Sequence, residues 1–533
     1  MNWTIGLFLV ISFVVSLVAL AGFIWAIGTR QMSVDQSHAY TLFADGEAGR
    51  VDDPTTDTRD ESVGQHEHRD PAHALEDASS RRAVTLLLAS AVVWLVLGSI
   101  FGLVASLKMH WPDWLSGAGP LTFGRMRTLH LNAVIYGWLS LGGLGVAMWI
   151  VPRIFHARLR SPKLPIYGAL IWNLALAVGL AAIAYGFSDG EEWLEIPWQV
   201  DIFIAIGAAL FAWPMFRTMR ARDVRHIYVT GWYFIAALGW FPMLFVIANI
   251  PEIHAGAQEA TVNWWFAHNV LGLWLTPLGV GAAYYFIPKI IGEPIYSYTL
   301  SLLGFWALAL FYSQVGIHHI IGGPIPTWLA TLSIVHSMMM IVPVVAVAIN
   351  HHVTVARNLS VLRRSMPLRF VWIGALMYTL ASLQGATQAL RPVQTVVHFT
   401  QYTVAHAHLG VYGFVSLVLF GSVYHIMPRM TGAQWPYPRL IATHFWLTIV
   451  GFAIYFAALT VGGIEQGRAM LDASRPFADS VVLLKPYLVS RSAGGTLMTL
   501  GHFLFALNFF VLLARARQHA PGQAMATSVS AAP

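Results

Sequence analysis

The sequence predicts an all-α membrane protein, in which a bundle of twelve membrane-spanning helices follows one N-terminal anchor helix. Of its 533 residues, 57% are hydrophobic and only 11% are charged, whereas a soluble protein carries about 25% charged residues. The apolar residues gather in runs of about 20, the length that crosses a bilayer as a helix. The 22 histidines are more than packing requires and indicate metal or proton chemistry.

The chain contains no cysteine. This excludes disulfides, thiolate metal sites, iron–sulfur clusters and a covalent c-type haem on this chain. The formal net charge of +6 does not indicate a nucleic-acid partner, because Lys and Arg are concentrated in loops on one side of the predicted bundle. The surroundings we expect are membrane lipid.

The first apolar run, Ile5 to Ile27, predicts an uncleaved transmembrane anchor within residues 1–30, with its N-terminus outside. A signal peptide is the alternative, but no Lys or Arg precedes the run and Arg30 follows it, which is the opposite of a signal-peptide pattern. Residues 31–82 are polar without an apolar period and predict a mobile cytoplasmic linker. Residues 518–533 are expected to form a disordered tail.

The main domain, residues 83–517, contains twelve apolar segments. The loops between them alternate between rich and poor in Arg and Lys, and the positive-inside rule then places the linker and both ends of this domain in the cytoplasm. We find no internal repeat. The segments lie approximately at 84–106, 128–151, 165–186, 198–216, 228–250, 263–287, 298–320, 327–349, 369–390, 402–427, 440–461 and 494–514.

The stretch from Tyr402 to Gly413 reads Y-T-V-A-H-A-H-L-G-V-Y-G and lies in one of these apolar segments. Positions two apart on an α-helix differ by about 200°, so His406 and His408 leave opposite sides of one helix. They cannot share one metal, but each can ligate a different metal centre. Ionisable residues inside membrane spans are usually functional, and this pair suits a helix held between two haems.

Six histidines lie inside predicted spans or at their starts, and burying so many titratable groups without partners would be costly. Two axial imidazoles close both faces of a haem and make it an electron carrier, whereas one leaves a face open for a small gas. His130 and His408 suit the closed haem and His406 the open one. A copper or other transition metal facing the open haem suits the remaining three, His268, His318 and His319.

Tyr312 lies seven residues before His319, and therefore on nearly the same helical face about two turns away. A phenol at this place can give a proton and an electron to bound oxygen. His318 and His319 are adjacent and about 100° apart on an α-helix. To bring both onto one ion we expect the helix to loosen near Gly316 and the Gly322-Gly323-Pro324 stretch.

Five motifs carry a resemblance to a known family: W-W-F-A-H-N, Y-Y-F-I-P-K, F-Y-S-Q-V-G-I-H-H, T-V-A-H-A-H and H-I-Y-V-T-G-W-Y. Residues 84–515 resemble the catalytic subunit of cbb3-type cytochrome c oxidases, within the haem-copper oxidases. The resemblance implies a low-spin haem b, a high-spin haem b3 and one copper ion. Its ligands would be His130 and His408 for haem b, His406 for haem b3, and His268, His318 and His319 for copper. It also implies a covalent bond between Tyr312 and His268.

The resemblance further implies a terminal oxidase in a bacterial inner membrane, which reduces O₂ to water with electrons from cytochrome c. Protons would come from the cytoplasm. Membrane-anchored c-type cytochrome subunits are the expected partners. Arginines near the outer ends of spans are expected to contact the haem propionates, namely Arg125, Arg127 and Arg391. Side chains expected on the proton route are Tyr285, Ser297 and Tyr298.

The N-terminal segment carries its own resemblance. The run F-I-W-A-I-G-T-R-Q-M-S-V-D, followed by Tyr40 to Asp45, is similar to the small single-span maturation protein of cbb3 oxidases. The chain therefore resembles a fusion of that protein with the catalytic subunit.

Three stretches depart from the family pattern, and one of them is Ile320 to Pro324, which differs from the His/Tyr-containing stretch that usually follows the copper histidines. Gln384-Gly385-Ala386 stands where the family usually reads E-G-P, so an amide replaces a carboxylate implicated in proton handling. Glu192 and Glu195 keep part of an acidic motif, but Pro197 replaces a further acid. These changes weaken the expectation of a family-like proton route and of a calcium site, and they leave the six histidines untouched.

Two other functions compete with the oxidase. Nitric oxide reductases share the six histidines but carry a glutamate four residues after the first metal histidine, as a hard ligand for iron, and lack the tyrosine. Here that position is Gly272, and Tyr312 is present. A transporter without redox cofactors would typically show two similar halves, which we do not find.

Overall fold

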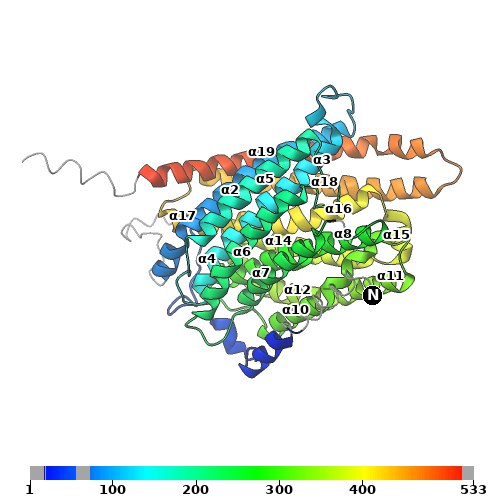
Figure 1. Cartoon of the computed structure of the whole chain (residues 1–533). Coiled ribbons are helices and arrows are strands. Elements are labelled where there is room, and N and C mark those ends of the chain that lie inside the picture. The colour runs from blue at the N-terminus through cyan, green and yellow to red at the C-terminus, as the bar shows by residue number, and fades with distance from the viewer. Residues whose placement is uncertain (1–16, 18–19, 56–72, 252, 519–533) are drawn as a thin grey trace, which may run out of the picture.

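The computed structural model describes residues 17, 20–55, 73–251 and 253–518, and within them the chain is helical, with one isolated bridge between Glu191 and Leu194. Twelve described helices are long and apolar enough to cross a membrane, which confirms the predicted all-α bundle (Figure 1). The predicted anchor, residues 1–30, lies mostly outside the described residues, as does the tail from 519 onward.

Several spans are built from two or three consecutive elements. The first six are α2 (Ala74–Lys108), α3–η4–α4 (Phe123–Asn132, Ala133–Ser140 and Leu141–Ile154), α5 (Leu164–Tyr185), α6 (Trp198–Arg220), α7 (Val229–Ala248) and α8–η5–α9 (Ala257–Asn269, Val270–Leu275 and Thr276–Ile291). The second six are α10–η6 (Tyr298–Phe311 and Tyr312–Ile320), α11–α12 (Thr327–Met339 and Ile341–Ala356), α14 (Met366–Gln388), α16–η7–α17 (Gln401–His408, Leu409–Ser416 and Leu417–Thr431), α18 (Pro438–Leu471) and α19 (Phe477–Gln518).

Three of these spans form the centre of the bundle. The most apolar windows of Phe123–Ile154, Ala257–Ile291 and Gln401–Thr431 are 94%, 89% and 83% buried, whereas those of the other nine are 39–50% buried. A helix that is apolar on every side belongs in an interior. The same three spans carry His130, His268 and the His406–His408 pair, whereas His318 and His319 lie on the span Tyr298–Ile320, whose most apolar window is 50% buried.

Two expected loop regions are helical. The stretch between the last two predicted segments, residues 462–493, consists largely of the ends of α18 and α19, which project as a hairpin beyond the other helices (Figure 1). The apolar period marked only the membrane-embedded part of each helix. Similarly, α2 begins at Ala74, inside the expected linker, because helix propensity continues past the apolar run.

The expectation of a mobile linker is wrong for residues 31–55, which pack against the ends of several spans. Gln36 donates a hydrogen bond to the carbonyl of Ile295 and accepts one from the amide of Tyr298, at 2.9 and 2.8 Å. Farther along, Glu47 forms an ion pair with Lys289. These polar side chains bind partners on the bundle, which is why the segment needs no apolar period of its own.

One ion pair is enclosed between two spans. Arg153 of α4 donates to both carboxylate oxygens of Asp77 of α2 at 2.8 Å, and the two side chains are only 1% and 6% exposed. The guanidinium also lies 4.4 Å from the centre of the Trp149 ring. Removing one partner of such a pair leaves an uncompensated charge, whereas replacing both can be nearly neutral.

We therefore expect Arg153→Met to lower the free energy of unfolding by about 3–5 kcal/mol, measured by denaturant titration in detergent. The double variant Asp77→Leu/Arg153→Met should recover most of that loss. Arg468→Met is the matched control, because its ion pair with Glu465 is exposed and should contribute no more than about 1 kcal/mol. Equal losses in both arginine variants would contradict this account of the buried pair.

Candidate metal-binding cavity

A cavity of about 580 Å³ lies at the centre of the bundle. All six candidate histidines and Tyr312 line it. These residues come from spans that are far apart in the sequence, and helix packing brings them around one space. The structure thus places the candidate ligands together, as the sequence pattern predicted.

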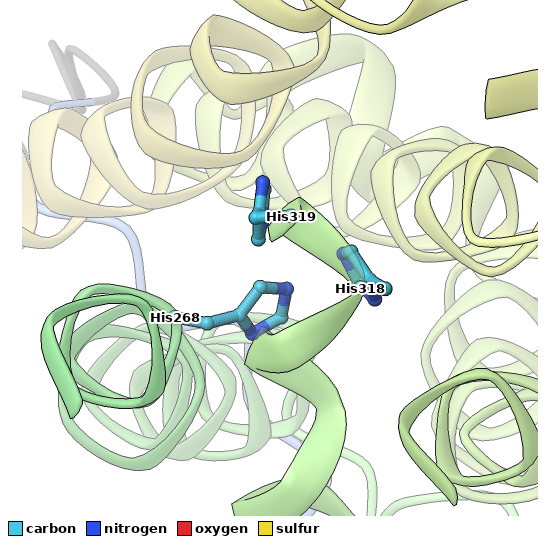
Figure 2. Close-up of side chains that lie close together, drawn as sticks. All are labelled: His268, His318 and His319. Carbon is cyan, nitrogen blue, oxygen red and sulfur yellow. The ribbon is translucent and has the colours of Figure 1, made fainter. Parts of the chain in front are cut away.

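Three imidazoles converge on one side of the cavity. One ligand nitrogen from each of His268, His318 and His319 lies within 4.8 Å of the others. In Figure 2 the ring of His268 extends from α8 toward the other two rings, which come from η6. The Nδ1 atom of His268 is buried without a hydrogen-bond partner, while Nδ1 of His318 lies 2.9 Å from the Ser337 hydroxyl. Free nitrogens on converging rings fit a transition metal held by imidazole.

The backbone that carries the two adjacent histidines is a tighter helix than expected. Instead of loosening, the chain tightens into the 3₁₀-helical element η6, in which neighbouring side chains are about 120° apart. Gly316 lets this element approach α8, because a Cβ at that position would overlap the carbonyl of Trp264. The Trp264 ring in turn stacks on His319, with ring centres 4.4 Å apart.

His130 and His408 face each other across another part of the cavity. Their rings are nearly parallel, at 10°, with centres 6.3 Å apart. A metal–imidazole bond is about 2 Å long, so two rings on opposite sides of one metal have centres roughly 6 Å apart. Nδ1 of His130 lies 2.8 Å from the carbonyl of Gly98, and Nδ1 of His408 lies 2.9 Å from that of Val404. Such bonds leave Nε2 for a metal, so the pair fits a haem closed on both faces.

His406 points away from His408, as their spacing predicted. Its Nδ1 lies 3.2 Å from Oε1 of Gln384 on α14, whereas Nε2 of His408 lies 3.2 Å from the Tyr455 hydroxyl on α18. Gln384, which stands where the family usually has a glutamate, is therefore the partner that orients the His406 ring. Partners of this kind set the basicity of a ligating imidazole, and here the acceptor is a neutral amide.

A π-helical segment follows three of the candidate ligands. The π-helical elements η4, η5 and η7 begin three residues after His130, two after His268 and one after His408. Widened helical turns of this kind are rare and occur frequently at functional sites. They rotate the helix after the ligand, so that the histidine can face the cavity while the rest of the helix keeps its packing. Single-sequence patterns do not reveal them.

Tyr312 lies directly against the three-histidine cluster. Its ring centre is 5.2 Å from that of His268, at an angle of 40°, so the two side chains are adjacent, as a covalent bond between them requires. The ring fills the space beside Gly272, where a Cβ would overlap the phenol carbon. A glutamate at position 272 and a tyrosine at 312 therefore cannot occupy this arrangement together.

The expected arginine contacts divide into two groups. Arg127 lines the cavity and forms an ion pair with Glu192 at 2.9 Å. Arg125 and Arg391 are absent from the lining, and their guanidinium groups donate to the Ala184 carbonyl and the Thr331 hydroxyl at 3.0 and 2.9 Å. The other arginine among the described lining residues is Arg491 of α19, which we missed because it lies in the stretch expected to be a loop.

Polar side chains from neighbouring helices lie beside α10, which is itself apolar from Leu302 to Phe311. Tyr298 begins this helix and Tyr312 follows its last residue, a separation of about 21 Å along a helix. Between them, Asn350 donates to Ser301 at 3.0 Å and to the Tyr284 hydroxyl at 3.2 Å. The hydroxyls of two further tyrosines are buried without a hydrogen-bond partner among the described residues, namely Tyr233 and Tyr378.

Two side chains expected on this route have other roles. The hydroxyl of Tyr285 accepts a hydrogen bond from Arg153 at 3.2 Å and so belongs to the ion-pair region. Ser297 caps the N-terminus of α10 by accepting from the amide of Leu300, which is a common role of serine at this position. Tyr298 does lie on the route.

Glu195 lies in the loop before α6 and is only 5% exposed. Its carboxylate accepts a hydrogen bond at 2.8 Å from Asn132, the last residue of α3 before the π-helical η4. Burial, with a smaller contribution from Glu192, raises the pKa of Glu195 to about 7. An unfolded glutamate has a pKa near 4.3, so the folded protein holds this proton over a wider pH range.

Folding stability should therefore fall as the pH rises from about 4.3 to about 7, since the folded state binds more protons there. We expect the melting temperature of Glu195→Gln in detergent to exceed that of the unchanged protein at pH 8 and to match it at pH 4. Glu465→Gln, at an exposed carboxylate, is the control and should show no such difference. A carboxylate that stabilises the protein at pH 8 would instead indicate a bound cation beside it.

Comparison with known proteins identifies the family. Residues 82–497 match the family described as cytochrome c and quinol oxidase polypeptide I. The chain is 33% identical over 452 residues to the cbb3-type cytochrome c oxidase subunit CcoN1 of Stutzerimonas stutzeri, covering 82% of this chain and 95% of that protein. It is 31% identical to cytochrome c oxidase subunit 1 of Rhodobacter capsulatus, covering 79% and 83%.

More distant similarities agree with this result. A nitric oxide reductase polypeptide of Stutzerimonas stutzeri is 28% identical over 407 residues, covering 69% of this chain and 80% of that protein. A solved haem-copper terminal oxidase dimer shares the fold, with a TM-score of 0.68 at 17% identity, covering 81% and 84%. The chain thus belongs to the cytochrome c and quinol oxidase polypeptide I family and, within it, to the catalytic subunits of cbb3-type cytochrome c oxidases, which are terminal oxidases of the respiratory chain.

Proposed function

We propose that the central cavity holds two b-type haems and one copper ion, and that O₂ is reduced to water there with electrons from cytochrome c. The observation that carries this proposal is the cluster of three converging imidazoles with the Tyr312 phenol against it. Haem and copper supply reversible electron transfer and a place where a small gas binds.

His130 and His408 would hold the low-spin haem b, and His406 the high-spin haem b3. Support comes from the parallel, opposed rings of the first pair and from the backbone carbonyls that orient them. His406 lies on the other side of the same helix, with Gln384 as its partner. The helix of the His406–His408 pair would then stand between the two haems.

Copper would be held by His268, His318 and His319. Neutral imidazoles suit copper, whereas iron in a comparable site favours an added carboxylate. The space that such a carboxylate would need is filled by the ring of Tyr312, because Gly272 leaves it open. This observation favours O₂ reduction over nitric oxide reduction, which remains the alternative function on the basis of the more distant relative.

Tyr312 would give one proton and one electron to the oxygen substrate. Its ring is enclosed among His268, Gly272 and the cavity, which keeps bulk water from competing for that proton. The polar side chains along α10 would return a proton from the opposite end of the helix, entering at Tyr298. The replacement of the usual glutamate by Gln384 does not interrupt this group of side chains.

The membrane arrangement and partners follow from the same function. We propose that the Arg-rich loops and residues 31–82 face the cytoplasm, and that membrane-anchored c-type cytochrome subunits deliver the electrons. Arg127 and Arg491 are the arginines placed to meet haem propionates. The anchor, residues 1–30, would begin the maturation-protein-like part of a fusion, and a calcium ion near Glu192 and Glu195 stays a prediction.

Replacing Tyr312 by phenylalanine tests the catalytic role. We expect the purified Tyr312→Phe enzyme to keep about one copper per two haems and to lose O₂ reduction by about two orders of magnitude or more, because the proton donor is gone. Metal analysis, haem spectra and turnover on O₂ and NO are the measurements. Iron in place of copper, with NO turnover indifferent to the substitution, would move the chain to the reductase class.

A substitution at Gly272 tests the arrangement of the tyrosine. Gly272→Ala should displace the Tyr312 ring and lower O₂ turnover by about tenfold or more, while the three imidazoles still bind copper. Gly239→Ala is the matched control, because a Cβ there meets no atom closer than 3.9 Å. Copper content is measured together with turnover, so that displacement of the phenol can be distinguished from collapse of the metal site. Full activity in Gly272→Ala would refute the steric argument.

A further inference from the structure

The part of the chain before the family match docks on the end of the bundle where α10 begins. We call residues 31–52 the docking segment. Gln31 donates to the carbonyl of Arg225 at 2.9 Å and accepts from the amide of Ile227 at 2.8 Å. Gln36 makes the same two-way contact with the carbonyl of Ile295 and the amide of Tyr298. Gln31 thus binds backbone groups just before α7, and Gln36 binds backbone groups at the start of α10.

Ion pairs hold the C-terminal end of the docking segment on the bundle. Glu47 pairs with Lys289 of α9, and Asp52 pairs with Arg429 of α17. The amide of Gly49 donates to the carbonyl of Gly292 at 2.7 Å. Although burial alone would raise the pKa of the Glu47 carboxyl, its contacts with His73 and Lys289 hold that pKa well below its ordinary value. The segment is therefore fixed at both ends, with residues 37–46 between the anchors.

A stacked pair of imidazoles lies under this segment. His38 of the docking segment covers His226, with ring centres 3.7 Å apart and planes within 6° of each other. His226 is only 6% exposed, and its Nε2 lies 2.8 Å from the hydroxyl of Tyr298. The tyrosine at the start of α10 thus has a histidine as its outer neighbour, and that histidine is covered by a residue from outside the family match.

We propose that His226 is the proton donor to Tyr298 at the mouth of the α10 route, and that His38 is a positioning residue that holds the His226 ring on Tyr298 by stacking. This inference rests on the proposed function, since it assumes that protons reach Tyr312 along α10. In the step itself, the Nε2–H proton of His226 passes to the Tyr298 oxygen, while the Tyr298 proton, which is otherwise donated to the Ile227 carbonyl, passes to a water molecule on the inner side. Water on the outer side returns a proton to Nδ1 of His226, and exchange with water then restores the tautomer that carries the proton on Nε2.

The surroundings of the pair suit this role. Burial, and secondarily the proximity of His38, lower the pKa of His226 to about 4, so the imidazole is neutral near pH 7 and can both accept and donate. The titratable groups around the pair are Tyr298 and Tyr228, from α10 and the start of α7, and Asp35 of the docking segment. The Asp35 carboxylate accepts a hydrogen bond from the amide of Ser37 at 2.9 Å and also interacts electrostatically with His38.

Three variants of the full-length enzyme, assayed in its complex in native membranes, separate stacking from other roles. His38→Ala removes the stacked ring, His38→Phe keeps a flat ring without a titrating nitrogen, and Tyr40→Ala is the control at an exposed position of the same turn. O₂ consumption and proton uptake after a single reduction pulse are followed from pH 6 to 9.

We expect His38→Ala to match the unchanged enzyme at pH 6, where protons are abundant, and to lose about tenfold in proton uptake at pH 8.5. His38→Phe should restore most of that rate, and Tyr40→Ala should follow the unchanged enzyme throughout. Equal rates in His38→Ala and the unchanged enzyme would overturn the proposal, and so would equal losses in His38→Ala and His38→Phe. Failure of the proposed function would instead appear as no O₂ consumption by the unchanged enzyme.

Discussion

The close approach of η6 to α8 is the contact on which the candidate site depends. Gly316 lets the two elements meet, and the tight 3₁₀ turn of η6 directs His318 and His319 toward His268. The same approach seats the Tyr312 ring in the space beside Gly272. Two glycines therefore decide whether three imidazoles and one phenol meet, because any side chain at either place would push the elements apart.

The bundle supports this contact by enclosing it. Three of the four spans that carry candidate ligands are far more buried than the others, so most of the imidazoles lie where lipid and water are excluded and where unpaired polar groups would be costly. Four of the candidate ligand histidines have a hydrogen-bond partner on Nδ1. The partners of His130, His408, His318 and His406 are Gly98, Val404, Ser337 and Gln384. These hydrogen bonds satisfy one nitrogen of each ring, which lowers the cost of burying it.

Charged and polar groups concentrate at one end of the bundle, where the docking segment lies. Its glutamines, Glu47 and Asp52 bind groups on several different spans. The catalytic centre lies deep in the membrane, so protons that reach it must enter through an end of the bundle. The docking segment covers the start of α10 and brings His38 onto His226, a contact that the twelve spans alone do not contain.

The sequence by itself determined the number of spans, the six histidines and the opposed directions of His406 and His408, because apolar runs and helical periodicity are local properties. The extent of α18 and α19, the order of residues 31–55 and the place of Arg491 were decided by tertiary structure, since each depends on neighbours distant in the chain. The π-helical turns also depend on tertiary structure. So does the position of the Tyr312 ring, which fills the space beside Gly272 and excludes a larger side chain there. The residue types determine which side chains can bind a metal. Only the packing of the helices determines which of these side chains lie close together.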